Sequence, residues 1–371
     1  MSTVLISAII GTLVCELVFV WWNHYNLPKP SDYKRDPQQS TRSSISILIP
    51  ARDEEKNIEA CIQAVMKQTV VPKEVLVLDD HSTDQTPAIL EKLQKEFTKL
   101  RVVRGKELPE GWVGKSFACH QLAQEATGDW YLFIDADARL KPKAIEKLLP
   151  VIETEEPGII SGFPQQIVKT WGEKLVVPLM LVAVMMHLPI KYIKKSHDPL
   201  FSAAHGGFVA IERNAYHNSG GHEAVKESLV EDMDLFKRQK QLHNSATLLN
   251  VDTLVKMRMY EDFRSVWFGY QKNFFANLDR KSSLLSLVLL YYFTLFILPL
   301  VLIKEVPILL VGIAYALGVL VKYSIDRMHG IPGWISFLMP LSVVLLIGIG
   351  LDSMLQSVTK KGYSWKGRQY Q

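Results

Sequence analysis

The sequence is poor in cysteine and carries no large excess of charge of either sign. Its 371 residues include three cysteines, Cys15, Cys61 and Cys119, which lie far apart. An odd number of widely spaced cysteines argues against a disulfide framework or a zinc site and fits a reducing compartment. The formal net charge is +4, and no basic stripe is interleaved with aromatic residues. The composition therefore does not indicate nucleic acid as a partner.

Two catalytic motifs are present only as fragments. The Gly-Lys-Ser sequence at positions 114–116 would end a Walker P-loop, but that loop requires glycine at the position occupied by Pro109. The His-Glu pair at positions 222–223 lacks the second histidine of a zincin helix. We therefore reject a P-loop, and the sequence does not support a metalloprotease.

The first long apolar run, Val4–Trp22, is long enough to span a bilayer. No basic segment precedes it and no small-residue cleavage site follows, so it is predicted to be an anchor over residues 1–24 rather than a signal peptide. Basic residues follow in the polar linker at 25–43, which by the positive-inside rule places the next domain in the cytoplasm. The carboxylate of Glu16 inside this run is expected to stay protonated or to meet a neighbouring helix.

The C-terminal third is apolar almost throughout and predicts transmembrane or re-entrant helices over residues 281–355, followed by a basic tail at 356–371. Three spans would leave the tail outside, whereas its basic residues favour the cytoplasm, so one of them is expected to be re-entrant or interfacial. A shorter run, Leu175–Leu188, suits an interfacial or a buried helix. We expect a multi-pass protein of the cell membrane. The predicted spans are Leu284–Ile303, Val306–Val321 and Ile335–Leu351, with turns at Lys304–Pro307 and Lys322–Gly333.

Between these membrane segments, residues 44–280 alternate apolar strands with amphipathic helices. Such alternation predicts right-handed crossovers and a doubly wound, Rossmann-like α/β fold with a parallel or mixed sheet. Sheets of this kind bind ligands beyond the carboxyl ends of their strands. The predicted strands are Ser46–Ile49, Glu74–Leu78, Arg101–Arg104, Trp130–Ile134 and Val209–Ile211, and the first predicted helices are Glu54–Lys67, Thr86–Phe97 and Ser116–Ala126.

The loops after these strands carry carboxylates. Asp135 and Asp137 directly follow a strand that is apolar on both faces, and two carboxylates this close can converge on a divalent cation such as Mg²⁺ or Mn²⁺. An isolated Asp-Ala-Asp is also common as a solvated acidic turn. Asp80 could accept the imide hydrogen of a uracil, and Glu54 could bond ribose hydroxyls. One of Ser82, Thr83 and Asp84 is expected to cap the following helix.

Taken in order, these motifs resemble the inverting family 2 glycosyltransferases, which have a GT-A fold. The resemblance runs from about Ile45 to about Phe275 and rests on PARDEEKNI at 50–58, LDDHSTDQT at 78–86 and DAD at 135–137. The family more often has asparagine where this chain has Asp53 and glycine where it has His81. The resemblance implies a UDP-sugar donor and a divalent cation bound by Asp135 and Asp137. It implies donor contacts from Pro50, Arg52, Glu54, Asp80, Lys115, Asp135 and Asp137.

The acceptor side is expected further along the chain. Glu231 and Asp232 open a predicted helix, where acidic residues are common for dipole reasons alone. The pair also resembles the family's general-base motif, which implies that Asp232 is the catalytic residue. The Gln-x-x-Arg-Trp motif of many membrane members is missing, which weakens the case for a polysaccharide synthase. Residues expected on the acceptor side are Trp112, Gly206, Gly207, Glu231, Arg264, Trp267 and Lys272.

The tail reads Trp-Lys-Gly-Arg-x-Tyr at 365–370 and, together with GWVGKS at 111–116, resembles the membrane glucosyltransferases of carotenoid biosynthesis. This likeness implies transfer of glucose from UDP-glucose to the carboxylate of a C30 carotenoid acid dissolved in the bilayer. Two alternatives remain. One is a transferase that acts on a polyprenyl phosphate, a ceramide-like lipid or diacylglycerol. The other is a nucleotide-sensing membrane scaffold without catalysis.

Overall fold

The computed structural model of the protein describes residues 1–34, 43–155, 157–275, 278, 280–359, 363–365 and 368–370. It contains two compact units. We call Leu27–Gln165 with Ile190–Arg258 the sheet unit, and Met1–Asn26, Gln166–Pro189 and Met259–Gln371 the helical unit. Residues 166–189 and 259–280, predicted from the sequence to belong to the soluble domain, thus pack with the apolar helices. Residues 35–42 of the predicted linker lie outside the described residues.

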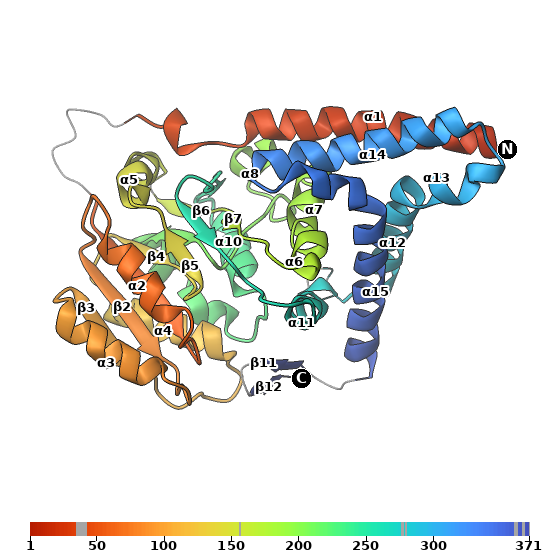
Figure 1. Cartoon of the computed structure of the whole chain (residues 1–371). Coiled ribbons are helices and arrows are strands. Elements are labelled where there is room, and N and C mark those ends of the chain that lie inside the picture. The colour runs from red at the N-terminus through yellow and green to blue at the C-terminus, as the bar shows by residue number, and fades with distance from the viewer. Residues whose placement is uncertain are drawn as a thin grey trace. The chain divides into compact units, whose positions relative to one another are not determined.

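The sheet unit is built on a seven-stranded sheet with the order β3-β2-β1-β4-β8-β6-β9. Figure 1 labels β2, β3, β4 and β6 of this sheet. The pairs β3-β2, β2-β1 and β1-β4 are parallel, whereas β8 runs antiparallel to both β4 and β6. The predicted doubly wound mixed sheet is therefore confirmed. Its strands are β1 (Ile45–Ala51), β2 (Glu74–Asp79), β3 (Leu100–Arg104), β4 (Trp130–Phe133), β6 (Gly158–Ser161), β8 (Val209–Glu212) and β9 (Ser245–Leu248).

Amphipathic helices connect these strands. In α2 the buried residues Ile58, Cys61, Ile62 and Val65 follow the i, i+3, i+4, i+7 spacing of one helical face. The helix begins at Ile58 and not at Glu54 as predicted, because residues 54–57 form a turn. The other helices of this unit are η1 (Pro30–Asp32), α3 (Thr86–Glu96), α4 (Gly114–Glu125), α5 (Ala144–Thr154), α8 (Lys191–Lys195), α9 (Arg213–Asn218), η2 (Gly221–Val225) and α10 (Glu231–Gln241).

A smaller sheet starts directly after the Asp-Ala-Asp sequence. It has the order β5-β10-β7, with β5 at Ala138–Leu140, β10 at Val255–Met257 and β7 at Gln165–Gln166. β5 and β10 are antiparallel and pair Ala138 with Met257. This pairing anchors the turn that holds the two aspartates to a strand from much later in the chain.

Among the described residues of the helical unit, three helical segments are long and apolar enough to cross a membrane: α1 (Ser2–Asn26), α14 (Ile308–Met328) and the continuous segment Gly333–Val358. The last consists of η5 (Gly333–Leu338) and α15 (Met339–Val358). In Figure 1, α1 and α14 lie side by side and α15 runs crosswise to them. The indole nitrogen of Trp21 donates to Ser324 at 3.2 Å, which fixes α1 against α14.

The first predicted C-terminal span is broken. The helix α12 (Ser282–Phe296) is followed by the segment Leu298–Lys304, which consists of α13 (Leu298–Val301) and η4 (Leu302–Lys304). The helix and this segment are bent by 51° relative to each other, which is the geometry of either a broken span or a re-entrant loop. The expectation that one of the three spans is re-entrant or interfacial stays a prediction. Tyr291 on α12 donates a hydrogen bond to Glu16 of α1, so the carboxylate meets a neighbouring helix as expected.

Shorter elements complete the helical unit. The apolar run at 175–188 is divided between α6 (Trp171–Val176) and α7 (Leu179–His187), with Pro178 at the break. α11 (Phe263–Phe274) packs against α6 and α15. In the tail, β11 (Tyr363–Trp365) pairs with β12 (Arg368–Tyr370). The tail lysines at 360, 361 and 366 lie outside the described residues.

The turn predicted at Lys322–Gly333 is wrong in its first half, because α14 continues through it to Met328. Lys322 and Asp326 are both fully buried, and their Nζ and Oδ2 atoms are 2.6 Å apart on successive turns. Ser336 donates a second hydrogen bond to the same Asp326 oxygen at 2.8 Å. A buried ion pair with an added hydrogen bond neutralises the charges that made this stretch look like a solvent-exposed turn.

Removing one member of this pair should destabilise the protein. Asp326→Ala leaves the Lys322 ammonium buried without its counter-charge, and we expect a loss of about 3 kcal/mol, measured by thermal unfolding in detergent. The control Glu91→Ala removes the exposed partner of Lys95 and should leave the melting temperature unchanged. The double variant Lys322→Met/Asp326→Leu should recover stability. An Asp326→Ala protein as stable as the parent would contradict this account.

Candidate functional site

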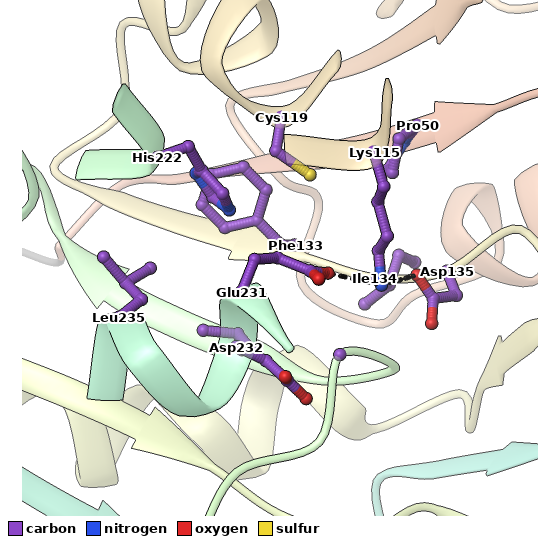
Figure 2. Close-up of a pocket in the computed structure, with 12 residues that line it drawn as sticks. Pro50, Lys115, Cys119, Phe133, Ile134, Asp135, His222, Glu231, Asp232 and Leu235 are labelled. Atoms are coloured by element: carbon purple, nitrogen blue, oxygen red, sulfur yellow. Dashed lines mark ion pairs between the residues drawn. The ribbon is translucent and has the colours of Figure 1, made fainter. Parts of the chain in front are cut away.

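A pocket lies at the carboxyl end of β4, where the antiparallel strand β8 begins. The register pairs Phe133 with Val209, so Asp135, two residues after β4, and Gly206, three residues before β8, emerge at the same edge of the sheet. Figure 2 shows the side chains that surround the pocket. They are Pro50, Lys115, Cys119, Phe133, Ile134, Asp135, Gly206, Val209, His222, Glu231, Asp232 and Leu235.

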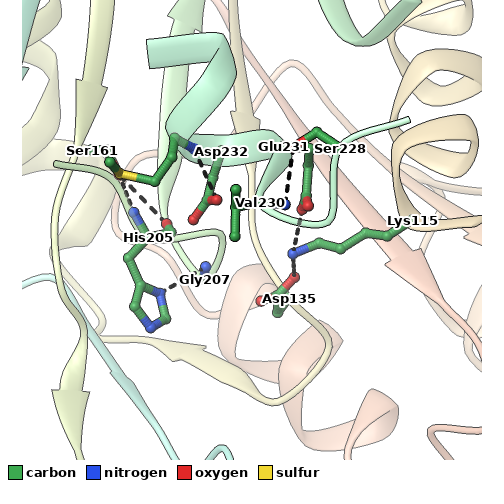
Figure 3. Close-up of polar contacts among 10 residues, drawn as sticks. Lys115, Asp135, Ser161, His205, Gly207, Ser228, Val230, Glu231 and Asp232 are labelled. Carbon is green, nitrogen blue, oxygen red and sulfur yellow. Dashed lines mark hydrogen bonds and ion pairs between the residues drawn. The ribbon is translucent and has the colours of Figure 1, made fainter. Parts of the chain in front are cut away.

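Lys115, in the first turn of α4, connects two carboxylates at the centre of this pocket (Figure 3). Its Nζ atom is 2.9 Å from Oδ1 of Asp135 and 3.0 Å from Oε1 of Glu231. Burial opposes the charge on Lys115, but Asp135 and Glu231 outweigh it and hold the pKa of Lys115 well above its usual value. Lys115 is therefore a permanent cation held between the two carboxylates.

Gly206 leaves the space in which these groups meet. A Cβ atom at this position would lie 2.5 Å from Nζ of Lys115 and 3.7 Å from Oδ2 of both Asp135 and Asp232. Any side chain would therefore displace Lys115 or fill the gap between the two aspartates. The structure brings together four predicted site residues from distant parts of the chain: Lys115, Asp135, Gly206 and Asp232.

Asp232 lies in the first turn of α10, beside Glu231. Burial and then the negative charge of Glu231 raise the pKa of Asp232 to about 6, while Lys115 and the backbone N–H of Met233 oppose the shift. The Met233 nitrogen donates to Oδ1 of Asp232 at 2.9 Å. A carboxylate whose pKa lies this close to neutrality can accept and release a proton under physiological conditions.

The loops after β1 and β2 are joined by hydrogen bonds. Arg52 Nη1 donates to the backbone oxygen of Asp80 at 2.6 Å, and the backbone nitrogen of Glu54 donates to Oγ1 of Thr86 at 2.8 Å. Asp84 accepts from the backbone nitrogen of Thr86 at 2.9 Å, but the N-cap residue of α3 is Gln85, so the predicted cap at Ser82, Thr83 or Asp84 is wrong. Arg52, Glu54 and Asp80, predicted as donor contacts, therefore belong to one connected pair of loops.

The two positions at which the chain departs from the family pattern share an unusual backbone conformation. Asp53 has φ of 50° and His81 has φ of 55°, both in the left-handed region. Glycine enters this region without strain, and asparagine, aspartate and histidine enter it more often than other residues. Oδ1 of Asp53 also accepts from the backbone nitrogen of Thr83 at 2.7 Å, which ties the two loops together. These substitutions therefore preserve the loop geometry.

Asp137 lies on the turn between β4 and β5, together with Asp135. Burial raises the pKa of the nearby Cys61 thiol to about 12, and the charges of Asp137, Glu54 and Asp135 add to the shift while Arg139 opposes it. The three carboxylates that were predicted to contact the donor or a cation therefore all raise the pKa of one buried thiol.

Among the described residues, no group of three or more His, Cys, Asp or Glu side chains is arranged to hold a metal ion. Asp135 and Asp137 nevertheless supply the hard oxygen donors that Mg²⁺ and Mn²⁺ prefer. The missing side chain at Gly206 also leaves space beside Oδ2 of Asp135. The residues present therefore fit a divalent cation that takes its remaining ligands from water and a bound phosphate.

The other predicted acceptor-side residues divide between the two units. Trp112 packs edge-on against Phe117, with ring centroids 5.2 Å apart, just before α4. Gly207 is required by close packing, since a Cβ there would lie 2.9 Å from the sulfur of Met257. These residues belong to the sheet unit, together with the pocket.

Arg264, Trp267 and Lys272 lie on α11 of the helical unit, and none is among the described residues that line the pocket. The indole nitrogen of Trp267 donates to Oδ2 of Asp352 at 2.7 Å. This hydrogen bond joins α11 to α15, so Trp267 has a structural role inside the helical unit.

Sequence reasoning did not select two buried histidines in and beside the pocket. His222 lines the pocket, and its Nδ1 is 2.9 Å from the hydroxyl of Tyr216. Burial lowers the pKa of His222 to about 3 and that of His205 to about 4, so both are neutral at physiological pH. Nδ1 of His205 accepts from the backbone nitrogen of Gly207 at 3.0 Å and so fixes the Gly206 loop. The only signal in the sequence was the adjacent Gly-Gly pair.

Comparison with known proteins identifies the class. Residues 46–220 match the model of the family described as glycosyl transferase family 2. The chain is also similar in structure to the mannosyltransferase PcManGT from Pyrobaculum calidifontis, solved in complex with GDP-Man and Mn²⁺. The TM-score is 0.56 at 16% identity, over 96% of this chain and 99% of that one. The chain therefore contains a glycosyltransferase family 2 domain with a GT-A fold and is a glycosyltransferase.

More specific relatives share a single name. The chain is 26% identical over 339 residues to the 4,4'-diaponeurosporenoate glycosyltransferase of Staphylococcus aureus strain MRSA252, covering 88% of each protein. It is 28% identical over 245 residues to the enzyme of the same name from Staphylococcus haemolyticus, covering 65% of this chain and 63% of that relative. The resemblance inferred from the motifs is confirmed at the level of these names.

The raised pKa of Asp232 predicts a pH-dependent cost in stability. An ordinary aspartate loses its proton near pH 3.8, but folded Asp232 keeps it until about pH 6. The native state therefore loses stability relative to the unfolded chain as the pH rises from about 4 to about 6. The melting temperature of Asp232→Asn, relative to that of the parent, should therefore rise between about pH 4 and about pH 6 and stay constant at higher pH. Glu91→Gln, which removes an exposed carboxylate with a lowered pKa, should show no such gain. A flat difference for Asp232→Asn would contradict the shift.

Proposed function

We propose that the protein is a membrane-bound, inverting glycosyltransferase that transfers glucose from UDP-glucose to the carboxylate of a C30 carotenoid acid, 4,4'-diaponeurosporenoate. The observation that carries the proposal is the convergence of Lys115, Asp135 and Asp232 around Gly206 at one edge of the sheet. In this proposal the arrangement would hold the leaving diphosphate next to a carboxylate on the acceptor side, as a single displacement requires.

The donor would lie along the connected loops after β1 and β2. Asp80 would accept the imide hydrogen of uracil, and Glu54 would bond the ribose, with Pro50 and Arg52 shaping the loop. Arg52 supports this assignment because it holds the backbone of Asp80 in place. Asp135 and Asp137 would hold the divalent cation, Mg²⁺ or Mn²⁺, whose charge neutralises the leaving diphosphate.

In the transfer, an acceptor oxygen would form a bond to the anomeric carbon on the face opposite the diphosphate. The bond from that carbon to the diphosphate oxygen breaks, and its electron pair leaves with the phosphate, which inverts the configuration. Lys115 would move its charge toward that phosphate. With a hydroxyl acceptor, Asp232 would take the proton of the hydroxyl group. A carboxylic acid acceptor is already ionised at neutral pH, so almost no proton remains to be removed.

A membrane-dissolved acceptor is supported by the relatives' names and by the apolar helices. Both relatives described above are named for a carotenoid acid substrate. In the described part of the chain, three helices are long and apolar enough to cross a bilayer, and a fourth apolar segment is bent. We propose that the sheet unit faces the cytoplasm at the cell membrane, where UDP-glucose is available. Trp112, Gly206, Gly207 and Glu231 of the sheet unit would meet the acceptor.

The state of Asp232 favours a second candidate, transfer to a hydroxyl-bearing membrane lipid such as a ceramide-like lipid or diacylglycerol. A buried aspartate with a pKa of about 6 is suited to remove the proton of a hydroxyl group. Mass spectrometry of pigments and lipids, after UDP-glucose is added to membranes that contain the protein, separates the two. A glucosyl ester of the carotenoid acid supports the first candidate, and a glycosylated lipid alone supports the second. No glucosylated product of either kind would contradict both.

The first candidate predicts unequal effects of two substitutions. With the carotenoid acid as acceptor, Asp232→Asn should lower the single-turnover rate less than Asp137→Asn, because there is no proton to remove while the diphosphate must still be neutralised. We expect at least a tenfold difference between the two variants. An Asp232→Asn protein as inactive as Asp137→Asn would count against a carboxylate acceptor.

A further inference from the structure

We propose that Lys115 blocks the cation site in the free enzyme. Its ammonium group pairs with Asp135 and leaves that carboxylate only when a nucleotide diphosphate binds. The inference rests on the proposed function, because it assumes that Asp135 is a cation ligand. Its basis is the position of one ammonium group between Asp135 and Glu231, with contacts of 2.9 and 3.0 Å.

The ammonium and a divalent cation compete for the same carboxylate. A cation bound to either oxygen of Asp135 would lie within a few ångströms of Nζ of Lys115, since metal–oxygen bonds are about 2 Å long. The Lys115 and Asp135 side chains are 23% and 27% exposed, so solvent screens this repulsion only weakly. In the free enzyme the ammonium therefore lowers the affinity of the site for a divalent cation.

A diphosphate changes this balance. Its negative oxygens offer Lys115 a new partner and at the same time give the cation additional ligands. Glu231, whose side chain is 9% exposed, still needs a counter-charge, so Lys115 is expected to turn about this second contact rather than leave the pocket. Glycine at position 206 is needed for the ammonium to lie here at all, since a Cβ there would come within 2.5 Å of Nζ. Cation and nucleotide then bind together, and neither occupies the site fully alone.

The experiment measures Mn²⁺ binding by electron paramagnetic resonance on the full-length protein in detergent at pH 7.5, with and without UDP. For the parent, UDP should strengthen Mn²⁺ binding at least tenfold. Lys115→Met should bind Mn²⁺ at least tenfold more tightly than the parent without UDP, and the gain from UDP should shrink. Lys115→Arg, which keeps the charge, should behave like the parent. Lys115→Gln, which keeps polar contact with both carboxylates, should follow Lys115→Met and serves if the Met variant does not fold.

The matched control is Lys194→Met. Lys194 pairs with Glu155, whose side chain is 1% exposed. This variant therefore also removes the lysine partner of a buried carboxylate in the sheet unit. Neither Lys194 nor Glu155 is among the described residues that line the pocket. Its Mn²⁺ affinity should equal that of the parent, and an equal rise would overturn the inference. Unchanged or weaker binding by Lys115→Met and Lys115→Gln without UDP, while the parent binds Mn²⁺ with UDP, would also overturn it. If the parent binds no Mn²⁺ even with UDP, the cation assignment in the proposed function fails instead.

Discussion

The ion pairs of Lys115 are the interaction on which the site depends. Asp135, Glu231 and Asp232 approach one another where solvent access is limited, and three carboxylates so placed would repel one another without a cation among them. Lys115 compensates two of them directly. The residual repulsion falls on Asp232, where it adds to burial and raises the pKa. One lysine thus holds Asp135 and Glu231 together and, by opposing the upward shift, also influences the pKa of Asp232.

The reversed strand β8 allows these residues to meet. In a fully parallel sheet, only the carboxyl ends of strands reach the ligand edge. Because β8 runs antiparallel to β4, its amino-terminal end reaches that edge too and brings the Gly206 loop against Asp135. The sequence predicted the buried strands and polar loops, since both leave local patterns of apolar and acidic residues. It could not predict the direction of β8, which is decided by its neighbours in the sheet.

Other differences between the prediction and the structure also come from contacts with distant parts of the chain. The start of α2 moved to Ile58 because Glu54 and its neighbours bond to the loop after β2, a partner about thirty residues away. α14 runs past Lys322 because Asp326 neutralises that charge inside the helical unit. The left-handed backbone at Asp53 and His81 explains why these residues replace asparagine and glycine, but φ values are not visible in a sequence. Local propensity predicts an element, and tertiary contacts decide where it ends.

The sheet unit is assembled from two stretches of chain, with residues 166–189 between them packed in the helical unit. Asp135 and Lys115 come from the first stretch, and Gly206, Glu231 and Asp232 from the second. During synthesis the ribosome therefore releases the first half of the acidic cluster well before its counterpart exists. The nascent chain therefore cannot complete the candidate site until the apolar segment 166–189 between the halves has left the exit tunnel.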